Sequence, residues 1–331
     1  MKRFRNASII SLFVIIAFAK CIPTTPGGGT VTPAATYREI IDTAYGTDPQ
    51  QKMNIYLPAG RTTTDTKTIV LIHGGGWQTG NKDEATYTAI VNRIKVTWPE
   101  VAIVNMNYRL VTGASSTTHL PEIISDVTAA FNFLQANKTA FVISSKYGIW
   151  GLSAGAHIAT LYAYAYDPNH NIKAVADWFG PTDFITPQPG DVNFLLVLFG
   201  QSKNIYTVEK ELLGVERAAN PQLWNDASPL NKVTSITPPT IMIHDDADLV
   251  VPYNHSYQLM TKLNASGVNN SFINISYFIE NMPSNLFHFN PSFHDFTDPG
   301  NCGTVDCGIF DMNVIRNYSV DTTLHYMKRF M

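Results

Sequence analysis

Apolar residues follow two different periods along the chain, and these periods predict its strands and helices. Apolar and polar residues alternate over 52–57, as in a half-buried strand. Continuous apolar runs predict buried strands at 68–72, 101–106, 147–150, 174–176, 240–243 and 275–279. The segments between these runs predict helices at 81–98, 123–134, 156–161, 253–264 and 320–330.

Strands that alternate with amphipathic helices predict an α/β fold, in which helices cover both faces of a mostly parallel sheet. The alternation breaks over 185–231, where prolines, polar turns and a hydrophobic stretch at 194–199 follow one another. We interpret this segment as an insertion that caps the substrate site. The sequence has no internal repeats, and one domain over 37–331 accounts for everything after the first residues.

The first 36 residues predict an export signal and a tether. Three basic residues precede an apolar run at 7–19, which is short for a membrane span, so residues 1–20 are interpreted as an export signal. Residues 21–36, rich in Pro, Gly and Thr, form the tether. Cys21 resembles the acylated residue of a bacterial lipoprotein, although Lys20 replaces the usual small residue. We expect a cell-envelope lipoprotein or a secreted or periplasmic protein, with an uncleaved anchor helix as the alternative.

Charge and cysteine content narrow the class of partner. The 331 residues carry a formal net charge of -3 without a basic stripe, which gives no reason to expect nucleic acid or anionic lipid. In an exported protein, Cys302 and Cys307 predict a small disulfide loop, because a metal site needs more ligands than two cysteines. The sequence leaves the oligomeric state open.

A candidate nucleophile lies in the turn Gly-Leu-Ser-Ala-Gly at 151–155. The turn follows a predicted strand and precedes a predicted helix, the context that gives a G-x-S-x-G pattern chemical meaning. Such a turn lifts the hydroxyl of Ser153 clear of the sheet, and the helix start favours developing negative charge. The alternative is a turn of small residues that only packs a helix on a strand.

Three consecutive glycines follow another predicted strand, in His-Gly-Gly-Gly-Trp at 73–77. Glycines at a strand end let the backbone turn sharply and approach a ligand. We predict that the N–H groups of Gly75, Gly76 and Ala154 bind the oxyanion of a tetrahedral intermediate, and that His73 supports the loop. A flexible glycine turn is the alternative.

Three aspartates follow the strand at 240–243, namely Asp245, Asp246 and Asp248. A serine triad needs a carboxylate here, because it orients the histidine and stabilises its charged form. From the residues alone the three compete, and a surface acidic loop is the alternative. Elsewhere, Arg109 and Asp126 predict a buried ion pair that holds a loop to a helix.

From about Tyr37 to the C-terminus, the chain resembles an α/β-hydrolase of the esterase/lipase class with the HGGGW motif. It is most similar to the bacterial BD-FAE-like esterases, which include acetylxylan and feruloyl esterases. The resemblance implies about eight strands, Ser153 as nucleophile, Asp248 as acid, and no cofactor or metal. It rests on the motifs at 73–77, 107–110, 151–155, 227–230 and 247–252.

The histidine of the triad is where the sequence departs from the family, which normally has Gly-His-Gly-Phe after the last strand. Here the loop 281–296 contains both His288 and His294. His294 keeps the His-x-Phe pattern with Phe296, and His288 lies nearer the usual distance. We favour His294 as the base and keep His288 as its alternative. His157, on the helix after Ser153, is interpreted as a packing or capping residue.

The sequence therefore predicts an exported serine carboxylesterase for short-acyl esters, with acetyl or feruloyl groups on plant polysaccharide as candidate substrates. Two other readings stay open. A serine peptidase of the prolyl-oligopeptidase type shares the triad order, but residues 22–60 leave no room for its N-terminal propeller. An inactive hydrolase fold that serves as a binding module is the second, because of the altered histidine loop.

Overall fold

An eight-stranded sheet forms the centre of the computed structural model, which describes residues 35–186, 196–198, 201–246, 248, 250–275 and 312–331. Among the described strands of this sheet, β2 runs antiparallel to both of its neighbours, β1 and β4, and the other pairs are parallel. This confirms the mostly parallel sheet. In spatial order the strands are β1 (Arg38–Ala44), β2 (Lys52–Leu57), β4 (Ala102–Met106), β3 (Thr68–Ile72), β5 (Tyr147–Leu152), β6 (Ile172–Trp178), β9 (Thr240–His244) and β10 (Asn270–Asn274).

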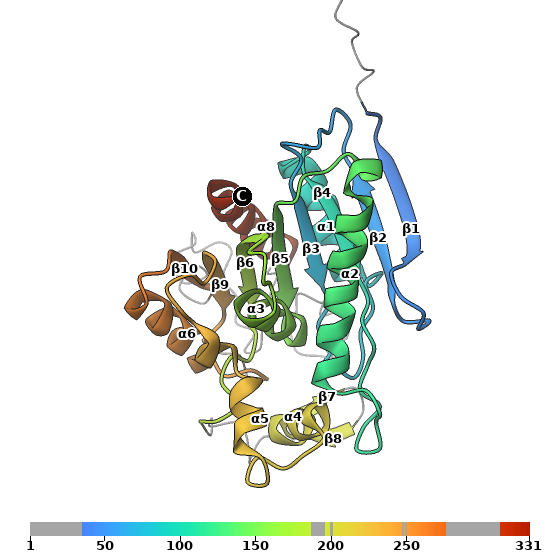
Figure 1. Cartoon of the computed structure of the whole chain (residues 1–331). Coiled ribbons are helices and arrows are strands. Elements are labelled where there is room, and N and C mark those ends of the chain that lie inside the picture. The colour runs from blue at the N-terminus through green and yellow to red at the C-terminus, as the bar shows by residue number, and fades with distance from the viewer. Residues whose placement is uncertain (1–34, 187–195, 199–200, 247, 249, 276–311) are drawn as a thin grey trace, which may run out of the picture. The chain divides into compact units, whose positions relative to one another are not determined.

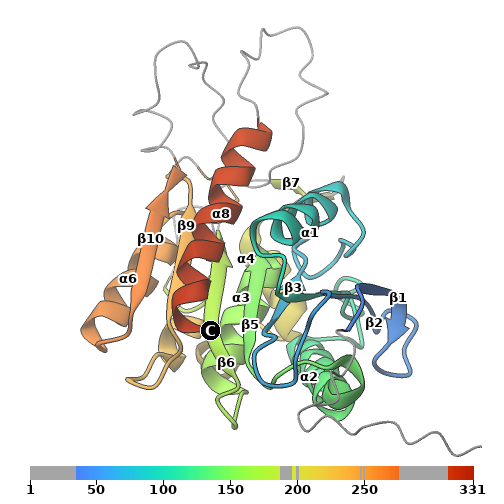
Figure 2. The same cartoon turned by 90° about the horizontal axis from the view of Figure 1, so that it is seen from above.

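Helices cover both faces of the sheet (Figures 1 and 2). On one face lie α1 (Ala85–Thr97) and α8 (Met312–Phe330), which contact each other. On the other face lie α2 (Leu120–Phe141) and α3 (Ala154–Ala165). A fifth helix, α6 (Asn254–Ala265), packs against β9 and β10.

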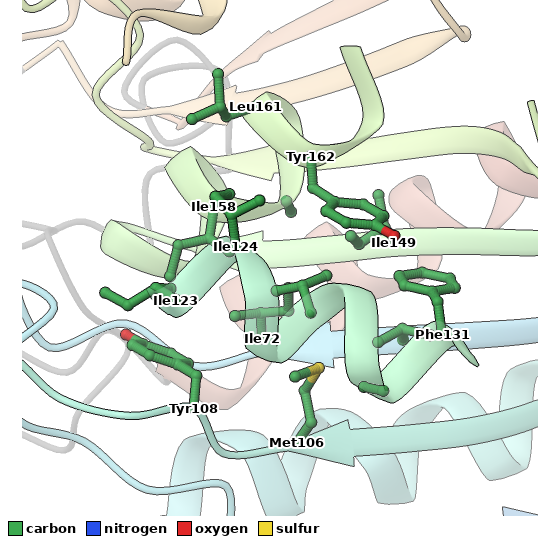
Figure 3. Packing of buried hydrophobic residues seen from close by; sticks show 14 of the residues in the cluster. Ile72, Met106, Tyr108, Ile123, Ile124, Phe131, Ile149, Ile158, Leu161 and Tyr162 are labelled. Atoms are coloured by element: carbon green, nitrogen blue, oxygen red, sulfur yellow. The ribbon is translucent and has the colours of Figure 1, made fainter. Parts of the chain in front are cut away.

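Successive residues of the central strands enter two different cores. In β3, Val70 and Ile72 pack in the cluster that contains residues of α2 and α3, whereas Ile69 and Leu71 pack with residues of α1 and α8. Figure 3 shows Ile72 beneath Ile123 and Ile158. Because both faces are covered, these strands are continuously apolar. Burying each such aliphatic side chain contributes about 1.5–3 kcal/mol to folding.

The predicted insertion lies between β6 and β9. Its described part comprises β7 (Leu196–Leu198), β8 (Gln201–Lys203), α4 (Ile205–Leu213), α5 (Pro221–Asp226) and the short 3-10 helix η1 (Pro229–Lys232). The side chain of Asn204 caps α4 by accepting from Thr207 N, and Gly214 ends this helix in a left-handed conformation. In Figure 1, α4 and α5 lie beyond the ends toward which β3 and β5 point.

Helix α1 begins at Ala85, so the predicted start at residue 81 is wrong. Asn81 to Glu84 form a turn, because Lys82 is needed elsewhere: its N–H donates to Asn107 Oδ1 (2.7 Å). Its buried ammonium group contacts Asp42 Oδ1 at 2.7 Å and the Asp83 carboxylate. These contacts pull the segment toward the sheet edge and out of helical geometry.

Two elements near the sheet edges also differ from the prediction. The structure has an edge strand, β10, at Asn270–Asn274, which the sequence did not predict. Of the strand predicted at 275–279, residues 276–279 lie outside the described residues. Strand β1 was not predicted at all. Both are edge strands with mostly exposed or half-buried residues, so neither has the continuous apolar run of a central strand. Helix α8 also begins earlier than predicted, at Met312.

The described residues all belong to one compact unit, Ala34–Met331. Among them, no helix has the length and apolar character needed to cross a membrane. The predicted export signal, Cys21, and the cysteines Cys302 and Cys307 lie outside the described residues. Export, acylation and the disulfide therefore stay predictions.

Candidate active site

Ser153 lies at the sharp turn between β5 and α3. Its backbone has φ 54° and ψ -122°, a conformation that costs a non-glycine residue about 1–3 kcal/mol. A methyl group on Gly151 would lie 2.0 Å from Gly155 O, and one on Gly155 would lie 2.2 Å from Ile72 O. Both flanking glycines are therefore required by close backbone packing.

Backbone hydrogen bonds fix this turn to the neighbouring strand and helix. Ser153 N donates to Trp178 O (2.8 Å) at the end of β6, and Ser153 O accepts from His157 N (3.1 Å). At the end of β6, Phe179 N donates to Ile243 O (2.8 Å) of β9. The carboxyl ends of β5, β6 and β9 are thus tied together, and Ser153 lies at that edge.

The glycine loop, His73–Trp77, follows β3 at the same edge. A methyl group on Gly74 would lie 3.2 Å from Ser153 Cβ, so the loop touches the candidate nucleophile. The next three residues, Gly75, Gly76 and Trp77, all have positive φ, at 107°, 57° and 59°. This conformation turns the backbone away from regular strand geometry directly beside Ser153.

Three backbone N–H groups near Ser153 are available to a ligand. Among the described residues, the N–H groups of Gly75, Gly76 and Ala154 have no hydrogen-bond acceptor. Ala154 is the first residue of α3, where the helix dipole places partial positive charge. These are the three donors that the sequence predicts for an oxyanion.

His73 holds the glycine loop. Its Nδ1–H donates to Gly74 O (2.7 Å), and its ring stacks on Tyr108 with centroids 4.4 Å apart. Tyr108 donates its hydroxyl to His73 O (3.1 Å), and Gly74 N donates to the hydroxyl oxygen of Tyr87 (2.6 Å). Burial lowers the pKa of His73 to about 4, which keeps the ring neutral. The predicted supporting role of His73 is confirmed by these contacts.

His157 ties the glycine loop to α3. Its Nδ1 accepts from Trp77 Nε1 (3.2 Å), and its Nε2–H donates to Ala227 O (2.8 Å). Its ring stacks on Phe184 at 4.7 Å. Burial lowers the pKa of His157 to about 4. With both ring nitrogens bonded inside the fold, His157 is a packing residue, as predicted.

Asp248 follows β9, and its side chain is fully buried. Its Oδ1 accepts from Val250 N (2.8 Å) and Val251 N (2.9 Å), and its Oδ2 lies 3.2 Å from His244 Nε2. Asp246 is exposed and accepts from Asn274 Nδ2 (3.1 Å). Of the three aspartates, Asp248 has its carboxylate held by two backbone donors and a histidine.

His244 is a partner of Asp248 that sequence reasoning missed. Its Nδ1 lies 2.7 Å from Ser256 Oγ, and its Nε2 lies 2.9 Å from Val251 O. Val251 O is an acceptor only, so Nε2 carries the proton and points it toward both this carbonyl and Asp248. The available signal was its place at the end of a buried strand, four residues before Asp248.

The two candidate bases, His288 and His294, lie outside the described residues, so the choice between them stays a prediction. Ser153, the glycine loop and the Asp248 loop follow β5, β3 and β9, and these parallel strands end at one edge of the sheet. The structure therefore brings the predicted nucleophile, oxyanion donors and acid to one edge. No group of side chains suited to hold a metal occurs in the described part of the chain.

Arg109 and Asp126 form the predicted ion pair. Arg109 Nη2 lies 2.6 Å from Asp126 Oδ1, and Asp126 is completely buried. Arg109 N and Gln51 Nε2 also donate to this carboxylate, at 2.8 Å and 2.6 Å. The pair fastens the loop after β4 to α2, and the prediction that it is structural is confirmed.

A cavity of about 440 Å³ adjoins the glycine loop. Its wall includes Gly76 and Gln78 from the loop region, Thr112 from the segment after β4, and Lys203, Val208 and Glu211 from the insertion. The insertion thus contributes to a cavity beside the candidate site. Sequence reasoning placed the cap there but missed these polar side chains.

Comparison with known proteins gives a consistent group of relatives. The model of the BD-FAE family matches residues 53–263. Esterase LipC of Mycobacterium tuberculosis is 23% identical over 236 residues, which cover 67% of this chain and 54% of that protein. The chain spans about half the length of the curated relatives it matches.

Solved structures share the arrangement of strands and helices. A truncated form of a carbohydrate esterase from gut microbiota has a TM-score of 0.58 and 23% identity, over 75% of this chain and 90% of that one. The bifunctional GH43-CE protein of Bacteroides eggerthii has a TM-score of 0.60 and 26% identity, over 71% of this chain and 34% of that one.

Proposed function

Because the chain belongs to the BD-FAE family and has the α/β-hydrolase fold, we propose that it is a carboxylic ester hydrolase with Ser153 as nucleophile. The observation that carries this proposal is the strained turn at Ser153, which lies against a glycine loop whose Gly75 and Gly76 N–H groups have no acceptor in the described part of the chain. Curated relatives named as esterases support the same reaction class.

The proposed reaction has two halves. Ser153 Oγ attacks the ester carbonyl while a histidine, His294 or else His288, takes the hydroxyl proton. The oxyanion of the tetrahedral intermediate lies against the N–H groups of Gly75, Gly76 and Ala154. The intermediate collapses to an acyl-serine as the histidine returns its proton to the departing alcohol. Water then attacks the acyl group by the same route and releases the acid.

Asp248 is proposed to orient the histidine. Two backbone N–H groups hold its Oδ1, and His244 lies against its Oδ2, so the carboxylate has little freedom to rotate. A fixed carboxylate selects one tautomer of the histidine and stabilises the imidazolium that forms. This division of labour makes Asp248 the acid of the triad and His244 its support.

The proposed substrates are short-acyl esters, with acetyl or feruloyl groups on plant polysaccharide as candidates. The name of one structural neighbour, a carbohydrate esterase, supports an ester of a sugar. The basic start, the apolar run and Cys21 support export, and a lipid anchor or a secreted form. Export and acylation rest on these residues alone.

Ser153→Ala tests the proposed reaction, with p-nitrophenyl acetate as substrate and p-nitroacetanilide as the amide control. We expect turnover of the ester to fall by about three orders of magnitude or more, with an unchanged melting temperature. Ser145→Ala, in the bend that precedes β5, is the matched control and should stay active.

Other outcomes of this experiment favour other readings. Amide cleavage as fast as ester cleavage would favour the peptidase. A folded wild-type protein that hydrolyses neither compound would favour an inactive binding module.

A further inference from the structure

The cavity beside the glycine loop shares a wall with the candidate catalytic centre. Gly76, whose N–H is a proposed oxyanion donor, also lines the cavity. Gly74 is two residues away, and because a methyl group on Gly74 would lie 3.2 Å from Ser153 Cβ, Gly74 Cα itself lies within roughly 5 Å of that atom. Since two residues of chain span at most roughly 7 Å, Gly76 lies within roughly 12 Å of Ser153. A group attached to the reacting ester can therefore reach the cavity.

Three polar side chains meet in the cavity wall, and we name them the Gln78–Lys203–Glu211 trio. Lys203 Nζ donates to Glu211 Oε2 (2.7 Å) and to Gln78 Oε1 (3.3 Å). Gln78 Nε2 donates to Glu211 Oε2 (2.6 Å). Gln78 follows the glycine loop, whereas Lys203 and Glu211 come from the insertion. The insertion and the loop are thus joined by charged hydrogen bonds at this point.

The trio has unused hydrogen-bonding capacity. Within the described part of the chain, Glu211 Oε1 accepts no hydrogen bond, although Oε2 accepts two. Lys203 uses two of its three donors, and Gln78 Nε2 uses one of two. The wall therefore offers both donors and an acceptor to a ligand.

The charges of the trio cancel, and this selects the kind of ligand. An anion would compete with Glu211 for Lys203, and a cation would compete with Lys203 for Glu211. Hydroxyl groups donate and accept at once, so they match a wall of mixed donors and acceptors without disturbing the pair. Thr112 adds a further hydroxyl to the wall.

Size and composition of the cavity agree with this selection. About 440 Å³ lies within the range of roughly 300–1,000 Å³ that small-molecule sites occupy. Of the described residues that line the cavity, none is aromatic, so a flat aromatic group would find no stacking partner there. Val111 and Val208 give a ring some apolar contact.

We propose that this cavity binds the uncharged, hydroxyl-rich alcohol part of the ester, such as a sugar ring, through the Gln78–Lys203–Glu211 trio and Thr112. The inference rests on the proposed esterase function, because it assigns the group that leaves when Ser153 is acylated. In this proposal the insertion determines which alcohols the enzyme accepts, whereas the residues at the carboxyl edge of the sheet carry out the reaction.

Two acetates of similar shape test the assignment. Methyl 6-O-acetyl-glucopyranoside carries ring hydroxyls, whereas cyclohexylmethyl acetate has a comparable ring and acetate without them. In Lys203→Met we expect kcat/KM for the sugar ester to fall about ten-fold or more, and kcat/KM for the cyclohexyl ester to stay within about two-fold. Thr112→Val removes one exposed hydroxyl and leaves the trio intact. It should lower kcat/KM for the sugar ester by about three-fold and leave kcat/KM for the cyclohexyl ester unchanged.

Lys210→Met is the matched control, since Lys210 lies on α4 but pairs with Glu216 (3.1 Å) outside the cavity wall. It should change neither rate. Equal losses on both esters in folded Lys203→Met, or no loss on the sugar ester in either cavity variant, would overturn the inference. A wild-type protein that hydrolyses both acetates equally well overturns the inference alone. One that hydrolyses neither overturns the proposed function as well.

Discussion

Acid should destabilise this protein strongly, because three histidines are buried in neutral form. Burial lowers the pKa of His73 to about 4, of His157 to about 4 and of His255 to about 3. In the unfolded chain a histidine titrates at about 6.5. Their folded pKa values are depressed, so their stabilising contribution is present above about pH 6.5 and is lost as the pH falls toward 4 and 3.

The size of the effect follows from these values. At about pH 5 the unfolded histidines are almost fully protonated and the folded ones are mostly neutral. Each then lowers the free energy of unfolding by about 2 kcal/mol, or roughly 6 kcal/mol for the three. Burial raises the pKa of Asp177, so protonation of this carboxyl increases the free energy of unfolding as the pH falls. This offsets part of the loss from the histidines. The remainder is a large share of the 5–15 kcal/mol typical of a domain.

Urea denaturation of the purified protein at about pH 7.5 and about pH 5 measures this loss. We expect the free energy of unfolding to fall by at least about 3 kcal/mol. His157→Gln should reduce the fall by about 2 kcal/mol, although it lowers stability at neutral pH. His325→Gln, on the exposed side of α8, is the control and should leave the fall unchanged. A fall below about 1 kcal/mol in the wild-type protein would refute the reasoning.

Three further predictions concern the site. His294→Ala should abolish ester hydrolysis and His288→Ala should not, with folding checked by thermal melt; the opposite result reverses the assignment, and full activity in both removes the triad. Gly155→Ala should lower the free energy of unfolding by about 1–3 kcal/mol, because the added methyl group lies 2.2 Å from Ile72 O; an unchanged urea midpoint would contradict that packing. Acetyl to butyryl esters should be hydrolysed faster than long-chain triglycerides in a panel of acyl lengths, and strong activation at an oil–water interface would instead indicate a lipase.

The central strands could be predicted because burial on both faces favours apolar or β-branched residues along their length. Strand β3 is buried on both faces, so all five of its residues are apolar or β-branched. Strand β1 lies at the edge, where most of its side chains are exposed, so its sequence differs little from a loop. A strand with one neighbouring strand and little burial does not require a regular alternation of apolar and polar residues.

The start of α1 could not be predicted from the local sequence, because it depends on contacts with residues far away in the chain. Lys82 is buried by contacts with Asp42, forty residues earlier in the chain, and with Asn107, twenty-five residues later. Neither contact leaves a signal within the helix window. The same limit explains the cavity, because Gln78 and Glu211 are 133 residues apart.

The sharp turns at Ser153, Gly75 and Gly76 could be predicted because turns that depart from regular geometry require particular residues at fixed spacing. The two glycines that flank the serine turn have no room for a Cβ, and this requirement is visible in five letters. Asp248 could be ranked above Asp245 and Asp246 only through the family resemblance. His244 was missed because a histidine at the end of a strand has no single meaning without its partners.

The bond between Trp77 and His157 joins two strand-to-turn segments eighty residues apart in the chain. One segment presents the glycine loop and the other presents Ser153, so neither can swing away while the indole and imidazole stay paired in the core. Inactivation by heat should then follow the same time course as loss of the whole fold, without an earlier phase in which a folded enzyme has lost its site. The rate at which a heated sample loses activity should therefore equal the rate at which the protein unfolds.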